Sequence, residues 1–164
     1  MHKNRIEALQ AMPIFGGIRK DILEFLLSVS EVLSVPKDNY FFHESDRADA
    51  MYVLEAGEVA VLKLWNGEQS VLRQLQRGDC FGEMAIMDLF PRSASIRAVT
   101  PCTAIQLSTE SFHKIYEMDL EQFALIQMNI GREVCRRLRV ADEQLFRVKM
   151  GEPDIDPAIV FPST

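Results

Sequence analysis

Cysteine, histidine and long apolar runs are all scarce in this sequence, and each shortage excludes a class of protein. The 164 residues include three cysteines without a CxxC pair and three histidines without an HxH motif. An odd number of widely separated cysteines argues against a disulfide framework or a zinc site and predicts free thiols in a reducing compartment. No apolar run approaches the ~18 residues that span a membrane, and no apolar segment follows the basic N-terminus as in a signal peptide. We therefore expect a cytoplasmic protein with no membrane partner.

Positive charge is also in short supply. Lysine and arginine number 18 against 24 aspartates and glutamates, which gives a formal net charge of −6. Broad nucleic-acid binding needs positive charge to displace counterions from phosphates, so this balance argues against it and leaves room only for a small local cationic pocket. The 48% hydrophobic and 26% charged residues are ordinary for a globular chain, and the length indicates a single domain.

The periodicity of apolar residues divides the chain into three parts. Residues 1–30 carry apolar side chains at helical spacings of three and four, interrupted at Gly16-Gly17. Residues 31–107 contain many short strand-like runs with turns every 8–12 residues, among them Asn66-Gly67, a strong hairpin signal. Helical spacing returns over residues 108–149.

These parts predict an α+β fold: a β-roll, jelly-roll-like in the manner of a double-stranded β-helix, flanked by N-terminal helices and a long C-terminal helix pair. The last helical region is expected near residues 120–148, where Gly131 could mark a bend or merely cost ~1 kcal/mol of helix propensity. We expect one domain over residues 1–149, followed by a Pro-rich tail at 150–164 that is loose or docked.

The segment most informative about chemistry is residues 81–96, Phe-Gly-Glu-Met-Ala-Ile-Met-Asp-Leu-Phe-Pro-Arg-Ser-Ala-Ser-Ile. Gly82 permits close approach of the backbone, and a helical turn after it would offer free N–H groups to an anion. Glu83 at the start of that turn makes sense if it accepts hydrogen bonds from hydroxyls. Arg92 supplies a planar, permanently charged fork suited to phosphate, and Ser93 adds a small donor. Together they suit a ligand with a sugar hydroxyl and one phosphate.

This segment resembles the phosphate-binding cassette of the cyclic nucleotide-binding domain family, whose pattern is Phe-Gly-Glu, an apolar-Ala-apolar turn, Pro-Arg and small-Ala-small-apolar. The spacing from Gly82 to Arg92 is similar to that of cAMP-dependent kinase regulatory subunits. The run Arg136-Arg137-Leu138-Arg139-Val140 resembles the last helix of the catabolite activator branch, and the similarity covers about residues 10–148. The resemblance implies a non-enzymatic sensor that binds a cyclic nucleotide, without a metal, and transmits its occupancy through the last helix to an unknown effector protein.

The resemblance also implies roles for individual side chains. Glu83 would accept the ribose 2′-hydroxyl, and Arg92 would pair with the cyclic phosphate, helped by backbone N–H groups near Ala85. Arg137 would reach the site from the last helix; the alternative is a solvated helix face. Val71 and Leu72 would line an apolar base pocket. The full set of candidate binding residues is Gly82, Glu83, Met84, Ala85, Arg92, Ser93, Ala94, Val71, Leu72, Arg137 and Asp142.

The identity of the base is predicted from the family resemblance and from two individual residues. The resemblance favours cAMP. Catabolite activators carry Thr-Ser where this chain has Ala141-Asp142, so that route to adenine is not expected here. The Asp142 carboxylate could accept from the two donors of guanine, and the Ser93 hydroxyl can reach a guanine amino group in cGMP-selective relatives. We expect cAMP as the ligand, with cGMP as the alternative. If the ligand is cAMP, Asp142 is expected to be a solvated helix residue.

Partners are predicted from the C-terminal part of the sequence. Val134, Leu138, Ala141, Leu145 and Val148 follow the 4-3-4-3 spacing of two heptads, which predicts a parallel homodimer through residues 134–148; the alternative is an amphipathic helix that covers its own barrel. Transcription regulators of the family continue into a helix-turn-helix domain. No recognition helix fits in the Pro-rich remainder, so we expect no DNA binding by this chain.

Three other functions are weighed against this interpretation. A degenerate scaffold or dimerisation domain would keep the fold without binding a nucleotide, but the intact Glu83 and Arg92 argue against it. A metal-dependent cupin enzyme also uses a small jelly roll, yet it needs clustered His and carboxylate ligands, and only His2, His43 and His113 are present. A haem or iron–sulfur sensor would need a thiolate pattern that three scattered cysteines do not provide.

Overall fold

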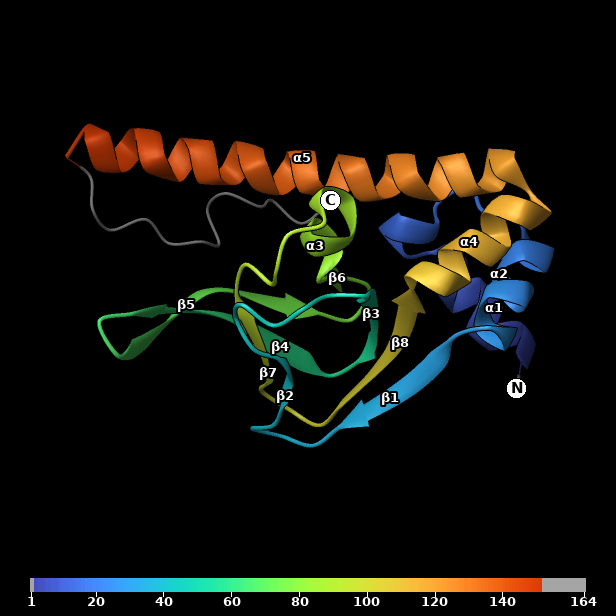
Figure 1. The fold of residues 1–164 in the computed structure, drawn as a ribbon, viewed down its shortest axis with the longest axis horizontal. Coiled ribbons are helices and arrows are strands. Elements are labelled where there is room, and N and C mark those ends of the chain that lie inside the picture. Colours follow the sequence, from blue (N-terminus) through green and yellow to red (C-terminus); the bar gives the residue numbers. More distant parts are fainter. Residues whose placement is uncertain (1, 152–164) are drawn as a thin grey trace.

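The computed structural model describes residues 2–151 and begins with three short helical segments (Figure 1). These are α1 (His2–Gln10), the 3-10 turn η1 (Pro13–Phe15) and α2 (Lys20–Ser28). Eight strands follow: β1 (Glu31–Val35), β2 (Tyr40–Phe42), β3 (Ala50–Ala56), β4 (Glu58–Trp65), β5 (Glu68–Gln76), β6 (Cys80–Phe81), β7 (Ser95–Ala98) and β8 (Cys102–Ser108). The other helices are α3 (Glu83–Asp88), which interrupts the strands, α4 (Thr109–Met118) and α5 (Leu120–Lys149).

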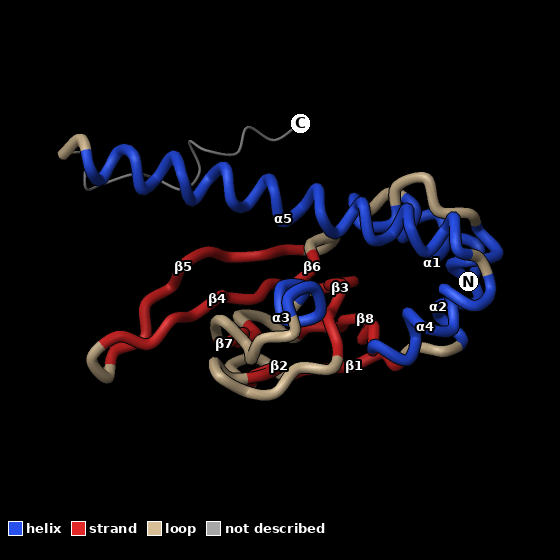
Figure 2. The backbone as a smooth tube through the Cα atoms, turned by 45° about the horizontal axis from the view of Figure 1, so that its top comes forward, coloured by secondary structure: helices blue, strands red, loops and turns tan. Residues whose placement is uncertain are grey.

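The strands form two antiparallel sheets of four strands each, in the orders β1-β8-β3-β6 and β2-β7-β4-β5. Helices α1, α2 and α4 gather at one end of the strands, whereas α5 runs along their whole length (Figures 1 and 2). This arrangement confirms the predicted α+β β-roll with N-terminal helices and a C-terminal helix pair. The predicted tail lies outside the described residues from 152 onward.

Two apolar cores hold these layers together, and β3 belongs to both. Met51 and Val53 pack with the helices, whereas Tyr52 and Leu54 face the interior of the β-roll. Successive side chains of a strand point to opposite faces, so a strand that is covered on both faces is apolar at nearly every position. The first five residues of β3 are accordingly all buried.

The β4–β5 hairpin turns at Asn66-Gly67, as predicted. Trp65 pairs with Glu68, and the two turn residues have φ angles of +49° and +83°. Both positive angles are what a two-residue turn between right-twisted strands requires. Further along the hairpin, Val61 pairs with Arg73 and Leu62 with Val71. Leu72 is therefore an extra, unpaired residue, a β-bulge.

Helix α5 is continuous over 30 residues and runs through Gly131, which fits the expectation of a local cost in helix propensity at this glycine. The Asp119 side chain accepts a hydrogen bond from the Gln122 backbone N–H at 3.0 Å and caps the helix start. Ile126 and Ile130, which precede the glycine, are fully buried against the helical core. Their packing offsets the ~1 kcal/mol that glycine costs within a helix.

The described part of the chain contains neither a membrane-spanning helix nor a cluster of metal-ligating side chains. None of its helices is both long enough and apolar enough to cross a bilayer. Between residues 2 and 151, no three His, Cys, Asp or Glu side chains are grouped so that they could hold a metal ion.

Candidate functional site

A cavity of about 520 Å³ opens between the β-roll, α3 and α5. Its volume falls within the ~300–1,000 Å³ usual for small-molecule sites. Among the predicted residues, the cavity brings together Leu72, residues 82–85, residues 92–94 and Arg137. They come from β5, from the turn into α3, from the loop before β7 and from α5, so segments up to 65 residues apart in sequence meet at one site.

Val71 and Asp142 do not line this cavity, contrary to expectation. Val71 is 55% exposed, because the bulge at Leu72 turns Leu72 and Arg73 toward the cavity and leaves Val71 on the other face of the strand. Ala141 lines the cavity, whereas Asp142 is exposed on α5. One residue along a helix is a rotation of about 100°, which is enough to move the carboxylate away.

Several cavity residues were not predicted, among them Phe42, Lys63, Arg73 and Val134. Lys63 is held in place by the Glu44 carboxylate at 2.5 Å and by the Ser93 carbonyl at 2.8 Å. The bulge beside Arg73 places Arg73 and its neighbour Leu72 on the cavity side of the strand together. The sequence signal for Arg73 was only an arginine next to two apolar residues.

Gly82 makes the turn from β6 into α3. Its φ angle is +77°, a left-handed conformation that disfavours any residue with a Cβ atom. A Cβ atom at this position would also lie 2.6 Å from Nη1 of Arg92 and 3.3 Å from the Phe42 ring. Glycine therefore allows both the sharp turn and the close approach of the Arg92 guanidinium.

Arg92 is a buried cation and not a surface loop residue, since it is only 5% exposed. Its Nη1 donates to the Gly82 carbonyl at 3.0 Å and its Nη2 to the Ala50 carbonyl at 2.7 Å. The guanidinium carbon lies 4.0 Å from the centre of the Phe42 ring, in cation–π contact. Burial lowers the pKa of Arg92, but an arginine this far above neutrality stays charged.

The Nε atom of Arg92 is buried and has no hydrogen-bond partner within the described part of the chain. Buried donors are almost always paired in folded proteins. No carboxylate makes an ion pair with Arg92 among residues 2–151 either. A cation held only by carbonyls and a ring, at the wall of a cavity, favours an anionic ligand.

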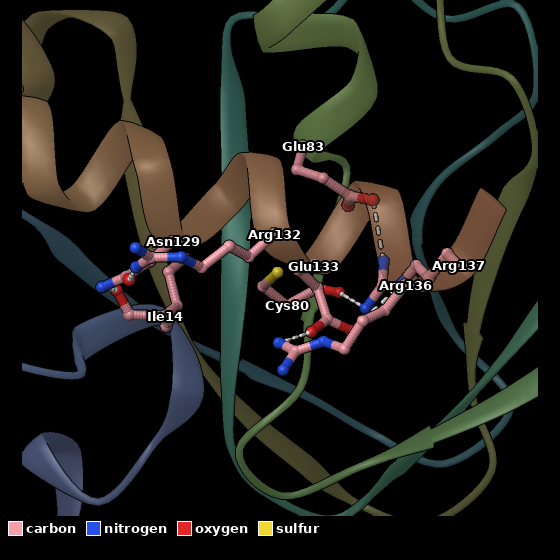
Figure 3. Close-up of polar contacts among 8 residues, drawn as sticks. All are labelled: Ile14, Cys80, Glu83, Asn129, Arg132, Glu133, Arg136 and Arg137. Atoms are coloured by element: carbon pink, nitrogen blue, oxygen red, sulfur yellow. Dashed lines mark hydrogen bonds and ion pairs between the residues drawn. The ribbon is translucent and has the colours of Figure 1, made fainter. Parts of the chain in front are cut away.

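Glu83 and Arg137 form a buried ion pair that joins α3 to α5 (Figure 3). Nη1 of Arg137 donates to Oε1 of Glu83 at 2.8 Å, and Nη2 donates to the Cys80 carbonyl at 2.6 Å. The Arg137 side chain is 13% exposed and the Glu83 side chain is 4% exposed. Arg137 thus reaches the site from the last helix, and the alternative of a solvated helix face is wrong for this residue.

Glu133 completes the surroundings of Arg137. It lies one turn earlier on α5, and its Oε1 accepts from Nε of Arg137 at 3.2 Å, while its other oxygen accepts from Arg136. Burial lowers the pKa of Arg137, but Glu83 and the other nearby anionic groups outweigh it and raise that pKa overall. Burial raises the pKa of the neighbouring Cys80 thiol to about 12, so this thiol is neutral and inert near neutral pH.

The site therefore has three chemically different parts. Arg92 and the Ser93 hydroxyl offer donors to an anion. Oε2 of Glu83 accepts no hydrogen bond from residues 2–151 and is open to a hydroxyl donor. Leu72 and Leu138 are part of a mainly apolar wall made by β4, β5 and α5.

Comparisons with known proteins match this arrangement. A family model described as the cyclic nucleotide-binding domain matches residues 32–119. The chain is 30% identical over 125 residues to the cAMP-activated global transcriptional regulator CRP of Salmonella typhimurium, which covers 75% of this chain and 58% of that protein. It is 29% identical over 107 residues to the cAMP-dependent protein kinase regulatory subunit of Emericella nidulans, with 65% of this chain and 26% of that protein covered.

A solved structure is similar as well. The crystal structure of Thermus thermophilus catabolite activator protein aligns with a TM-score of 0.73 at 28% identity, over 84% of this chain and 63% of that one. The chain spans a little more than half the length of the bacterial regulator named above. Residues 81–96 lie inside the segment that the family model matches, whereas α5 lies beyond it.

Proposed function

This chain belongs to the cyclic nucleotide-binding domain family, and from that premise we propose that it is a regulatory domain that binds cAMP in the cavity between the β-roll, α3 and α5. The observation that carries the proposal is that a buried cation, Arg92, and a buried carboxylate, Glu83, both lie on the wall of one mainly apolar cavity. The printed names of two relatives, a cAMP-activated regulator and a cAMP-dependent kinase regulatory subunit, support cAMP as the ligand.

Each part of the ligand has a proposed contact. Arg92 and Ser93 bind the cyclic phosphate, since charge-assisted hydrogen bonds to a planar guanidinium suit phosphate oxygens. Oε2 of Glu83 accepts a hydrogen bond from the ribose 2′-hydroxyl, while Oε1 keeps its hydrogen bond from Arg137. Leu72 and Leu138 pack on the faces of the base. The same donor and acceptor arrangement supports binding without catalysis, so we propose a regulatory and not an enzymatic role.

Signalling is proposed to pass through α5. A ligand shifts a conformational equilibrium only by as much as its affinity differs between the two states. Arg137, Leu138 and Ala141 line the cavity from α5, so a bound nucleotide would contact the helix directly and stabilise one of its positions. The absence of DNA binding stays a prediction.

The test is calorimetric titration of the full chain with cAMP and cGMP, followed by hydrogen exchange on the complex. We expect saturable binding with one site per chain, and slower exchange in residues 132–146 as well as 81–96. No heat with either nucleotide would contradict the proposal and favour a scaffold domain. Protection confined to residues 81–96 would show a domain that binds its ligand without moving α5.

The distal half of α5 supports a proposed homodimer. Of the predicted seam, Val134, Leu138 and Ala141 line the cavity of their own chain, whereas Leu145 and Val148 are 53% and 56% exposed. We propose that a second copy covers residues 134–148, with the cavity and the interface sharing one helix. Sedimentation equilibrium should give a dimer for the wild type and a monomer for Leu145→Glu. Met118→Glu, an equally exposed apolar position on α4, should leave the dimer intact; a monomeric wild type would contradict the seam.

A further inference from the structure

The outward side of helix α5 carries exposed apolar and basic side chains that have no part in the cavity. Ile126 and Ile130 mark the inward side, since both are fully buried in the helical core. A rotation of 100° per residue places a second set about half a turn from them, within about 60° of one another around the helix. This set, the outer stripe, consists of Met128, Arg132, Cys135, Arg139, Phe146 and the cap residue Met150, all of them exposed.

Both the apolar and the charged side chains of the outer stripe lack cover within residues 2–151. Met128 and Phe146 are each 56% exposed, and Arg139 forms no ion pair with any residue in that range. The proposed dimer seam is centred about 130° away around α5 and is a different surface. A surface that is both apolar and basic fits a partner that is both apolar and acidic.

The chain itself contains a segment of this composition directly after α5. Residues 152–161 read Glu-Pro-Asp-Ile-Asp-Pro-Ala-Ile-Val-Phe, with three carboxylates first and an apolar run after them. The segment holds no lysine or arginine, so its charge is opposite to that of the outer stripe. Pro153 and Pro157 fix their own φ angles, which lowers the conformational entropy that docking of the segment would cost.

The end of α5 allows the chain to turn back along the helix. Gly151 has a φ angle of +85°, and its N–H donates to the Val148 carbonyl at 3.1 Å. A left-handed glycine of this kind ends a helix and redirects the chain, and Pro153 two residues later prevents the helix from continuing.

The lengths of the segment and of the outer stripe agree. Asp156 follows Gly151 by five residues, which span at most about 17–18 Å. Arg139 precedes Gly151 by twelve helical residues, or roughly 18 Å along α5. Ten extended residues span at most about 33–36 Å, which reaches Met128 at roughly 34 Å. The carboxylates therefore arrive at the arginines, and the apolar run arrives at Cys135 and Met128.

We infer that residues 152–161 bind the outer stripe of α5 in their own chain. Asp156 pairs with Arg139, and the apolar run at 158–161 covers the side chains of Met128 and Cys135. The docked segment gives cover to the distal half of α5, in which no described residue after Ile130 is buried. This contact involves neither the cavity nor a nucleotide, so it stands or falls independently of the proposed ligand.

The experiment uses the Cys135 thiol, in the middle of the outer stripe, as a reporter. Cys80 and Cys102 are buried, whereas Cys135 is exposed among the described residues. N-ethylmaleimide therefore modifies Cys135 first, and as an uncharged reagent it is insensitive to the net charge of a variant. The modification rate is measured on the full chain without nucleotide. Circular dichroism on each variant checks that the fold is kept.

Charge reversal in the segment should uncover the thiol. An exposed ion pair contributes roughly a two- to five-fold factor to an equilibrium, and Asp156→Arg replaces an attraction by a repulsion. The variant should therefore be modified roughly 4- to 25-fold faster than the wild type. Combining Asp156→Arg with Arg139→Asp restores opposite charges and should restore slow modification. Glu7→Arg, an equal charge change at an exposed position on α1, should leave the rate unchanged.

A second copy of the chain is the competing occupant, and dilution distinguishes it. Protection by the chain's own segment should be independent of protein concentration and should persist in Leu145→Glu, the variant designed to be monomeric. Protection that disappears on dilution would assign the outer stripe to a second copy and overturn the inference. Equal rates in wild type and Asp156→Arg would also overturn it, as would a double variant that stays as reactive as Asp156→Arg.

Discussion

Arg137→Ala is expected to lower the free energy of unfolding by about 3–5 kcal/mol, the range found when one partner of a buried ion pair is removed. The variant leaves Glu83 as a buried carboxylate without its cation and the Cys80 carbonyl without its donor. Each group then carries the desolvation cost of a buried acceptor that has lost its partner. Urea denaturation should show a lower midpoint without a change in slope, as expected for a pure loss of stability.

Two variants test whether the ion pair is the cause. Arg139→Ala removes an arginine two residues along α5, on an exposed position, and should change stability by less than ~0.5 kcal/mol. The double variant Glu83→Leu with Arg137→Met removes both charges, and it should recover much of the lost stability because no buried charge is left unpaired. If Arg137→Ala is no more destabilising than Arg139→Ala, the buried pair does not contribute as described.

Features that depend on local backbone conformation could be predicted from the sequence. Asn66-Gly67 predicted the hairpin because both residues tolerate positive φ angles, and the turn has them. A helical turn after Gly82 was also predicted, and α3 begins at Glu83 directly after this glycine. The α+β fold was predicted from the different spacing of apolar residues in residues 31–107 and in the segments on either side. This spacing can be read from the sequence without knowing any tertiary contact.

Features that depend on register between strands could not be predicted. The bulge at Leu72 arises from how β4 and β5 align over eight pairs, and a shift of one residue exchanges the two faces of a strand. The family resemblance placed Val71 in the cavity without regard to register, whereas the bulge leaves Val71 outside the cavity and brings Leu72 and Arg73 to its wall. The contact between Glu83 and Arg137 joins residues 54 positions apart. The family resemblance indicated only that Arg137 reaches the site and not that it pairs with Glu83, and helical periodicity is equally consistent with a solvated arginine.

The second large effect is expected on ligand affinity. Arg92→Ala should weaken cAMP binding by roughly 10- to 100-fold or more, because charge-assisted hydrogen bonds contribute ~1.5–3 kcal/mol. Arg92→Lys should recover little of this loss, since an ammonium group lacks the planar fork. Arg47→Ala is the control: it removes an exposed arginine outside the cavity and should leave affinity unchanged. Calorimetry on folded variants gives the comparison.

Gly82→Ala tests the contact between Arg92 and the phosphate without replacing the arginine itself. The new Cβ atom would lie 2.6 Å from Nη1 of Arg92, so the guanidinium must move away from its position at the cavity wall. Gly67→Ala imposes similar strain, since its φ angle is +83°, but nothing lies within 4 Å of its Cβ position. Both variants should lose about 1–2 kcal/mol of stability from the left-handed conformation. Only Gly82→Ala should also lose affinity. If it binds cAMP as tightly as Gly67→Ala does, the position of the Arg92 guanidinium does not determine phosphate binding.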